Sequence, residues 1–156
     1  MGERIRNALF NSLGDEVYGA RVLDAFAGTG AVGIEALSRG AEHVTFIEKD
    51  RICQKIIGNN IQLLGIPQQT TLARSPLACW IKNNDEQKFD LIFADPPYHD
   101  TQLSTVEQLF GLLKPKACMV LSHPGRSEIR TKPGVVVVDN RSYGNAYLTF
   151  YRLVGA

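Results

Sequence analysis

Hydrophobic and polar positions divide the chain into two kinds of segment. Short runs of apolar residues predict buried strands, and longer segments with apolar residues three or four positions apart predict helices. The predicted strands are Arg21–Ala25, His43–Glu48, Thr70–Ala73, Phe89–Ala94 and Cys118–Ser122. The predicted helices are residues 4–13, the segment between Gly30 and Gly40, Arg51–Leu64, Pro76–Lys82 and Leu103–Leu113. Because strands and helices alternate, we expect a mostly parallel α/β sheet with helices on both faces.

The last segments break this alternation. Val135–Asp139 and Tyr147–Leu153 are joined by the polar segment Asn140–Asn145, which we expect to be a loop. That segment leaves no room for a crossover helix, so we expect an antiparallel hairpin. The sheet then has seven strands in a single domain over residues 1–156. This layout resembles the Rossmann-like fold of class I S-adenosylmethionine-dependent methyltransferases, although a fold alone does not give a function.

The composition limits the class of protein. The chain has 156 residues, with 17 Lys and Arg against 16 Asp and Glu, so nucleic-acid binding does not follow from its overall charge. It has no apolar run of the roughly 18–20 residues needed to cross a bilayer. Its three cysteines form no C-x-x-C pair, which argues against a zinc site or a disulfide framework. We expect a cytoplasmic protein with no membrane partner and no metal.

A glycine-rich loop follows the first predicted strand. Gly28, Gly30 and Gly33 form a G-x-G-x-x-G pattern between a strand and a helix, the context in which a backbone approaches a nucleotide. Asp24 ends the strand, where its charge disfavours a pyrophosphate and favours a cationic ligand such as S-adenosylmethionine. Glu48, at the end of the second strand, is a candidate acceptor for ribose hydroxyls. The alternative is that the glycines only form a tight turn and that both carboxylates are solvated.

The tetrapeptide Asp95-Pro96-Pro97-Tyr98 directly follows the fourth predicted strand. The two prolines remove two N–H donors, so the local backbone presents carbonyl acceptors, and Asp95 adds carboxylate acceptors. Such a site suits the exocyclic amine of a nucleobase, because Asp95 and the Pro96 carbonyl accept its hydrogens while Tyr98 stacks on the ring. Hydrogen bonding of both N–H groups favours a lone pair that points at a methyl donor. The alternative is a turn in which Asp95 caps a helix and Tyr98 packs in the core.

Together these residues resemble the RsmD family of methyltransferases. Three stretches carry the resemblance: residues 4–11, the segment from Asp24 to Gly40, and Tyr143-Gly144 followed by residues 148–152. The resemblance implies methyl transfer from S-adenosylmethionine, leaving S-adenosylhomocysteine, to N2 of a guanosine in 16S small-subunit ribosomal RNA. It implies these cofactor contacts: Asp24, Phe26, Gly28, Gly30, Glu48, Ser75, Leu77 and Asp95. The catalytic residues that it implies are Asp95, Pro96, Pro97 and Tyr98.

The resemblance also points to an RNA surface. The C-terminal part is locally basic, with seven Lys and Arg among residues 114–156 against two acidic residues. The candidate RNA contacts are Arg4, Arg6, Arg141 and Tyr143. Members of the family usually carry a basic hairpin ahead of the helix that contains Arg4, and this chain begins almost at that helix. We expect a monomer that acts on 16S ribosomal RNA within an assembling small subunit.

Three alternative functions remain open. The first is a DNA adenine-N6 or cytosine-N4 methyltransferase, which uses the same tetrapeptide chemistry but needs a target-recognition domain for which this chain is short. The second is a non-catalytic RNA-binding or ribosome-assembly module on the same fold. The third is a nicotinamide-dependent reductase, which Asp24 disfavours. We expect His123, after the fifth predicted strand, to be structural or exposed rather than a catalytic base.

Overall fold

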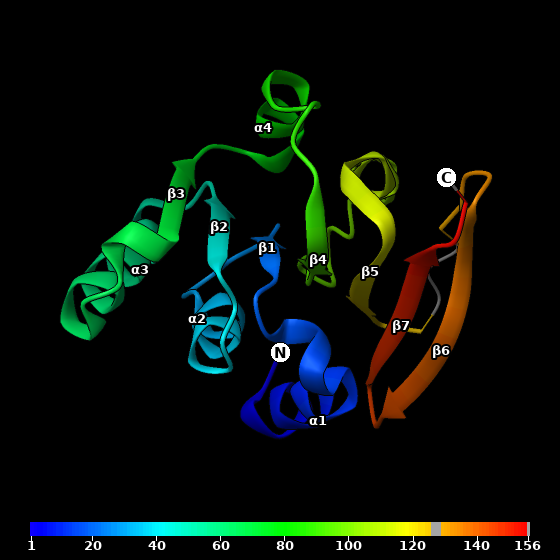
Figure 1. The fold of residues 1–156 in the computed structure, drawn as a ribbon, viewed down its shortest axis with the longest axis horizontal. Coiled ribbons are helices and arrows are strands. Elements are labelled where there is room, and N and C mark those ends of the chain that lie inside the picture. The colour runs from blue at the N-terminus through cyan, green and yellow to red at the C-terminus, as the bar shows by residue number, and fades with distance from the viewer. Residues whose placement is uncertain (126–128, 156) are drawn as a thin grey trace.

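The computed structural model describes residues 1–125 and 129–155. Its sheet has seven strands in the order β3-β2-β1-β4-β5-β7-β6 (Figure 1). The strands are β1 Arg21–Asp24, β2 His43–Glu48, β3 Thr70–Arg74, β4 Phe89–Ala94, β5 Leu113–His123, β6 Val135–Tyr143 and β7 Ala146–Leu153. The first five strands are parallel, whereas β7 runs antiparallel to both β5 and β6. The predicted sheet, mostly parallel with a C-terminal antiparallel hairpin, is confirmed.

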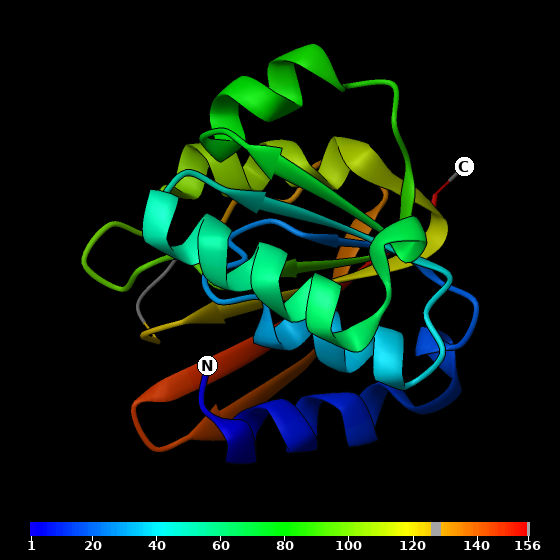
Figure 2. The same ribbon diagram turned by 90° about the vertical axis from the view of Figure 1, so that its left-hand side faces the viewer.

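Helices cover both faces of this sheet, as predicted. The α-helices are α1 Glu3–Leu13, α2 Ala31–Ser38, α3 Arg51–Leu64, α4 Leu77–Asn83 and α5 Leu103–Gln108. Three short 3-10 helices accompany them: η1 Gly14–Val17, η2 Pro67–Gln69 and η3 Leu109–Leu112. Figure 2 shows α1, α2 and α3 on one side of the sheet and α4 and α5 on the other. The buried side chains form two corresponding clusters, one with Phe10 and Ile57 and the other with Trp80 and Val106.

Alternation along the strands explains the two clusters. Successive residues of a strand point to opposite faces of the sheet. In β1, Val22 packs in the first cluster and Leu23 in the second, and in β5 Cys118 and Met119 divide in the same way. Because the central strands are buried on both faces, their sequences are almost wholly apolar. This explains why they were visible in the sequence as short apolar runs.

The C-terminal hairpin differs from its prediction in one respect. Strand β6 continues to Tyr143, which pairs with Ala146, so the polar segment Asn140–Asn145 is not a loop. The turn is Gly144 and Asn145 alone, and Gly144 adopts the left-handed conformation, with φ +66°, that such tight turns favour. Residues 140–142 are exposed on the edge strand. Polar side chains at an exposed edge give no apolar signal, which is why the loop prediction was wrong.

The segment before β5 also differs from its prediction. The expected helix Leu103–Leu113 is divided into α5 and η3, and Leu113 already belongs to the next strand. That strand was predicted to start at Cys118. Its first part was missed because two lysines and a proline interrupt the apolar run, and because Lys116 takes a positive φ of 71° there.

The order of the strands places a crevice between β1 and β4. From β1 the chain moves outward through β2 to β3, and it then returns to place β4 on the other side of β1. The carboxyl ends of β1 and β4 flank this switch point, where open α/β sheets bind their ligands. The fold therefore brings the glycine-rich loop after β1 close to the Asp95–Tyr98 tetrapeptide after β4.

Neither a metal-binding cluster nor a membrane-spanning helix is found in the part of the chain that the structure describes. No three His, Cys, Asp or Glu side chains in residues 1–125 and 129–155 are placed to hold a metal ion. No helix within those residues is long and apolar enough to cross a bilayer.

Candidate active site

A pocket of about 510 Å³ opens at the carboxyl ends of β1, β2 and β4. Its wall includes most of the predicted site residues: Phe26, Gly28, Glu48, Ser75, Leu77 and Asp95 to Tyr98. The start of the chain and the first residue of β7, next to the β6–β7 turn, also reach it, through Met1 and Ala146. Figure 2 shows the N-terminus, the loop after β4 and this turn on the same side of the molecule. Two motifs that are far apart in the sequence therefore meet in one cavity.

The backbone conformation or the lack of space explains why glycine stands at each of the three positions in the loop. Gly28 and Gly30 have φ values of +57° and +86°, a region that side chains other than glycine rarely adopt. Gly33 has no room for a side chain, because a Cβ would lie 2.3 Å from the ring of Phe46 on β2. The first two glycines shape the loop, and the third lets α2 pack closely against the sheet. Gly30 itself does not line the pocket.

Glu48 fixes two neighbouring backbone segments with its carboxylate. Its Oε1 accepts a hydrogen bond of 2.7 Å from the Gly28 N–H, and its Oε2 accepts one of 2.8 Å from the Asp50 N–H. Each carboxylate oxygen has two acceptor positions, so both oxygens retain capacity for a ligand hydroxyl. Glu48 is thus held at the pocket wall in a defined orientation.

Asp24 lies behind the loop rather than on the pocket wall. It is 3% exposed, and its Oδ2 accepts a hydrogen bond of 3.1 Å from the Gly33 N–H. Burial is the main cause that raises the pKa of Asp24 to about 7; the nearby carboxylates of Asp95 and Glu48 also raise it, and the hydrogen bond from Gly33 lowers it. The alternative in which Asp24 is a solvated loop carboxylate is therefore wrong. The carboxylates of Asp95 and Glu48 are thus close enough to Asp24 to affect its pKa.

Asp95 presents its carboxylate to the pocket. Its Oδ2 accepts a hydrogen bond of 2.9 Å from the α-amino group of Met1, which lines the same cavity. The next helix, α5, is capped at Gln102, so Asp95 is not a helix cap. The Asp95 carboxylate is therefore at the pocket wall, where it can accept a hydrogen bond.

Tyr98 is held by a residue that the sequence analysis missed. Its hydroxyl lies 2.9 Å from the Oγ of Ser122, and 41% of the Tyr98 side chain is exposed. The alternative in which Tyr98 packs in the core is therefore wrong. Ser122 is a single serine at the end of an apolar strand, and nothing in its sequence context indicates that it contacts the tetrapeptide.

Ser75 is on the pocket wall, but its hydroxyl is used locally. It donates a hydrogen bond of 2.9 Å to the carbonyl of Pro76, and the Ser75 N–H donates to the Glu48 carbonyl. The hydroxyl oxygen still has acceptor capacity toward the cavity. The neighbouring Leu77 is buried and adds apolar wall.

The four candidate RNA contacts differ in how exposed they are and in whether other residues already bind their side chains. Arg4 is exposed, whereas the Nε of Arg6 is directed at Glu35, 3.9 Å from its Oε1. Arg141 lies on strand β6 rather than in a loop, and its Nε donates to Asp139 Oδ2 at 2.9 Å. That carboxylate raises the pKa of Arg141 above its usual value. Tyr143, also on β6, is half-buried against the first core cluster.

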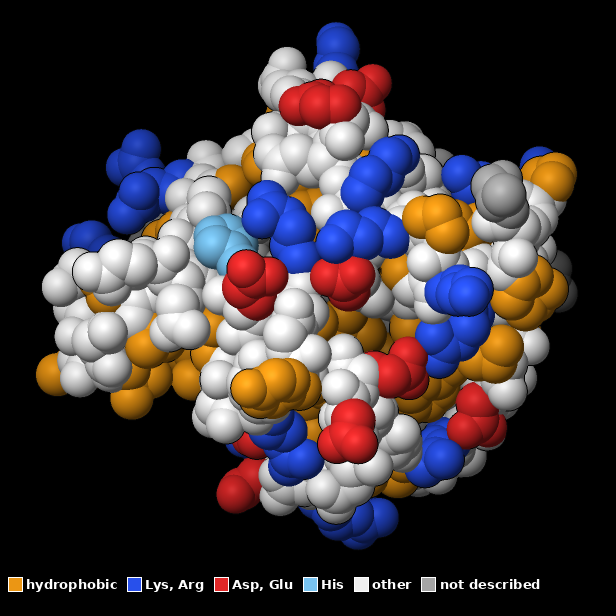
Figure 3. Space-filling model, in the orientation of Figure 1, with side chains coloured by type: hydrophobic (Ala, Val, Ile, Leu, Met, Phe, Trp, Pro, Cys, Tyr) orange, Lys and Arg blue, Asp and Glu red, His pale blue; other side chains and the backbone are white. Residues whose placement is uncertain are grey.

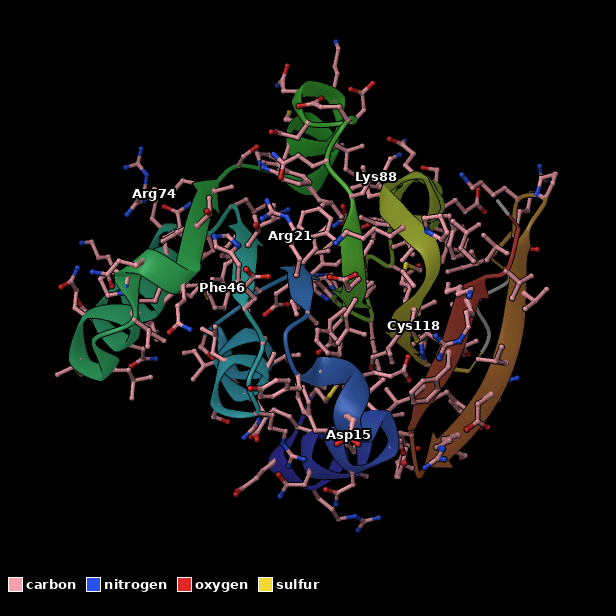
Figure 4. All side chains as sticks on the ribbon, viewed as in Figure 1. Asp15, Arg21, Phe46, Arg74, Lys88 and Cys118 are labelled. Atoms are coloured by element: carbon pink, nitrogen blue, oxygen red, sulfur yellow. The ribbon has the colours of Figure 1, made fainter. Side chains whose placement is uncertain are left out.

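The face of the molecule in Figure 3 does not present charge of one sign. Lys and Arg side chains on this face are interspersed with Asp and Glu. Arg21, labelled in Figure 4, lies near its centre, and Lys88 lies above it. Asp90 accepts hydrogen bonds from the Arg21 N–H at 2.8 Å and from Lys114 Nζ at 3.1 Å. The structure therefore offers no uniform basic patch on this side.

Comparisons with known proteins agree with the fold. A family model described as Conserved hypothetical protein 95 matches residues 1–152. Ribosomal RNA small subunit methyltransferase D of Haemophilus influenzae is 36% identical over 114 residues, which cover 72% of this chain and 58% of that protein. The YlbH protein of Bacillus subtilis is 30% identical over 159 residues, with 98% of this chain and 86% of that protein covered. The solved structure of yhhF from Escherichia coli has a TM-score of 0.88 and 25% identity, covering 99% of this chain and 89% of that one.

Proposed function

This chain is a methyltransferase that belongs to the family described as Conserved hypothetical protein 95, and we propose that it transfers a methyl group from S-adenosylmethionine to N2 of a guanosine in 16S ribosomal RNA. One observation carries the proposal. The glycine-rich loop and the Asp95–Tyr98 tetrapeptide line the same pocket. The proposed cofactor site at the loop therefore lies beside the proposed hydrogen-bond acceptor for the target amine in the tetrapeptide.

The pocket wall has the chemistry that S-adenosylmethionine requires. Glu48, held by two backbone N–H groups, is the acceptor for the ribose hydroxyls. Phe26, Ile47 and Leu77 line the pocket with apolar surface suited to the adenine ring. When bound, S-adenosylmethionine supplies an electrophilic methyl group on a positively charged sulfur. The acidic side chains beside the pocket favour a ligand that carries positive charge.

Asp95 and Pro96 orient the target amine. The Asp95 carboxylate and the Pro96 carbonyl accept hydrogen bonds from the two N–H groups of the amine. This leaves the nitrogen lone pair directed at the cofactor side of the pocket. The contribution of these residues is mainly positioning, since an amine conjugated to a ring is a weak nucleophile that reacts only in the correct geometry.

Tyr98 provides the surface on which the flipped base stacks. Its ring is partly exposed at the pocket, and its hydroxyl is tied to Ser122. Stacking on an aromatic face is a general way to hold an unpaired base. The ring and the Asp95 acceptor together select a planar group that bears an NH₂.

The choice of RNA over DNA rests on the relatives. Two of them, from Haemophilus influenzae and Buchnera aphidicola, are named Ribosomal RNA small subunit methyltransferase D, at 36% and 35% identity. The proposed substrate is accordingly the 16S RNA of an assembling small subunit, and the proposed acting form is a monomer. The proposed RNA contacts are Arg4, Arg6, Arg141 and Tyr143.

The test is a methyl-transfer assay with four separate acceptors. The purified chain is incubated with S-adenosylmethionine that carries a tritiated methyl group and with naked 16S RNA, small-subunit particles, large-subunit RNA or unmethylated duplex DNA. We expect label in the 16S RNA or in the particles alone. Label in DNA alone would support the DNA methyltransferase alternative, and cofactor binding without transfer to any acceptor would support the non-catalytic module.

A pair of variants in the loop after β4 ties the activity to the site. Asp95→Ala should reduce transfer at least about 100-fold, the scale on which a lost positioning contact acts, and should change cofactor affinity much less. Asp100→Ala, an exposed carboxylate in the same loop, is the matched control and should retain activity.

A further inference from the structure

A second groove adjoins the active-site pocket at Tyr98. Among the described residues it is lined by Tyr98, Pro124, Gly125, Gly144, Asn145 and Tyr147, and its volume is about 560 Å³. None of these six side chains carries a charge. Because Tyr98 lines both cavities, the groove continues directly from the position proposed for the target base.

Tyr147 forms a fixed aromatic surface in this groove. Its ring stacks on the ring of His123, with 5.8 Å between the centroids and 18° between the planes. Gly125 approaches the same ring so closely that a Cβ would lie 2.3 Å from it. Even so, 37% of Tyr147 remains exposed. Tyr147 is thus braced by its neighbours while part of it stays accessible from the groove.

His123 is itself held in one orientation. The Gly125 N–H donates to its Nδ1 at 3.1 Å, and its Nε2 lies 2.8 Å from the Oγ1 of Thr149, which donates to Asn140 Oδ1 at 2.7 Å. Since Nδ1 accepts, Nε2 carries the proton and the ring is neutral. Burial lowers the pKa of His123, which agrees with this neutral form. Both ring nitrogens are engaged, so His123 supports Tyr147 and is not a catalytic base, as its sequence context indicated.

We infer that this groove binds the nucleobase next to the target guanosine in an unpaired stretch of RNA, with Tyr147 as the stacking surface. The inference rests on the proposed function. A groove whose described lining residues carry no charge suits a neutral base better than a phosphate, and the Asn145 amide offers a donor and an acceptor to the edge of that base. Unpaired bases in RNA are commonly held by aromatic side chains in this way. A strand whose target base stacks on Tyr98 brings an adjacent base to the neighbouring groove.

The test uses a fragment of 16S ribosomal RNA that the full chain methylates, with 2-aminopurine on the 5′ or the 3′ side of the methylated guanosine. The fluorescence of 2-aminopurine falls when it stacks, so titration with the chain should quench one of the two probes. Tyr147→Ala should abolish this quenching and weaken RNA binding about 5- to 150-fold, and Tyr147→Phe should retain both. Tyr18→Ala, which removes an 80% exposed tyrosine ahead of β1, is the matched control and should behave as the parent chain does.

The outcomes separate this inference from the proposed function. A chain that methylates no RNA contradicts the proposed function, and the groove proposal fails with it. Methylation without quenching at either position overturns the groove proposal alone. So does a Tyr147→Ala variant that binds cofactor and RNA and quenches the same probe as the parent chain does.

Discussion

The hydroxyl groups of Tyr98 and Ser122 are hydrogen-bonded, with 2.9 Å between the two oxygens. Ser122 is 2% exposed near the end of β5, so a buried side chain of one strand fixes the aromatic ring that follows the neighbouring strand β4. The proposed stacking surface is therefore in place before a base arrives, which would reduce the entropy lost when the base binds.

This contact makes the Tyr98 hydroxyl important for positioning the ring. A hydrogen bond of this kind contributes about 0.5–1.5 kcal/mol, so Tyr98→Phe and Ser122→Ala should each lower kcat/KM for RNA about 2- to 12-fold. The double variant should be no worse than either single one, because both changes remove the same bond. Tyr98→Ala should lose a further 1–3 kcal/mol of stacking, roughly. Additive losses in the Tyr98→Phe and Ser122→Ala pair would show that the two residues act separately.

Asp24 should make stability depend on pH. Its pKa rises from 3.8 to about 7 on folding, so its protonated form is favoured in the folded protein, and the stability this provides is present below pH 4 and lost as the pH rises through 7. Asp24→Asn should therefore unfold like the parent chain at pH 4 but resist urea better at pH 8. The difference is at most about 4 kcal/mol, from three pKa units at 1.36 kcal/mol each.

The matched control for Asp24 is Asp15→Asn, which changes an exposed carboxylate at the start of η1. This variant should leave the dependence of stability on pH unchanged. The difference in the free energy of unfolding between Asp24→Asn and the parent chain should be larger at pH 8 than at pH 4. An equal difference at the two pH values would contradict the account of the buried Asp24 carboxylate.

Gly33 and Gly58 provide a matched pair of glycine-to-alanine changes within helices. A Cβ at Gly33 would lie 2.3 Å from Phe46, whereas a Cβ at Gly58 in α3 would meet nothing within 4 Å. Gly33→Ala should destabilise the protein by about 1–3 kcal/mol, as overpacking does, and should weaken cofactor binding by displacing the loop. Gly58→Ala should instead stabilise it by about 0.5–1 kcal/mol through helix propensity. Urea unfolding measures both, and equal effects would contradict the close packing of α2.

The candidate RNA arginines should contribute unequally to binding. Arg4 is exposed, whereas Arg141 is already bonded to Asp139. Arg4→Gln should therefore lower the salt dependence of RNA binding by about 0.7, the value for one phosphate contact on a single strand, and Arg141→Gln should lower it less. Lys82→Gln, at the end of α4, is the control. A binding curve with the same salt dependence in the parent and Arg4→Gln chains would remove Arg4 from the RNA surface.

The sequence was sufficient for the central sheet and for the two motifs of the site. Strands such as Phe89–Ala94 are buried on both faces, so their bounds follow from apolar composition alone. The resemblance to the RsmD family implied that Gly28 and Asp95 both contact the cofactor, and both line the pocket.

Other features were beyond the sequence because they depend on contacts between distant residues. Ser122 and Tyr98 meet only when β5 pairs with β4, and His123 meets Tyr147 only when β7 pairs with β5. The burial of Asp24 depends on the position of α2 over the strand end. The edge strand β6 was underestimated because its polar residues face water and look like a loop in the sequence.

The identity of the methylated nucleoside tests the central claim most directly. Small-subunit RNA is incubated with the purified chain and S-adenosylmethionine carrying a deuterated methyl group, and the digested nucleosides are separated by mass spectrometry, with Asp95→Ala run in parallel. The account predicts the deuterated methyl group in N2-methylguanosine alone, at no more than one per RNA molecule, and at least about 100-fold less of it with the variant. Deuterium in an adenosine or cytidine, or equal incorporation by Asp95→Ala, would contradict it.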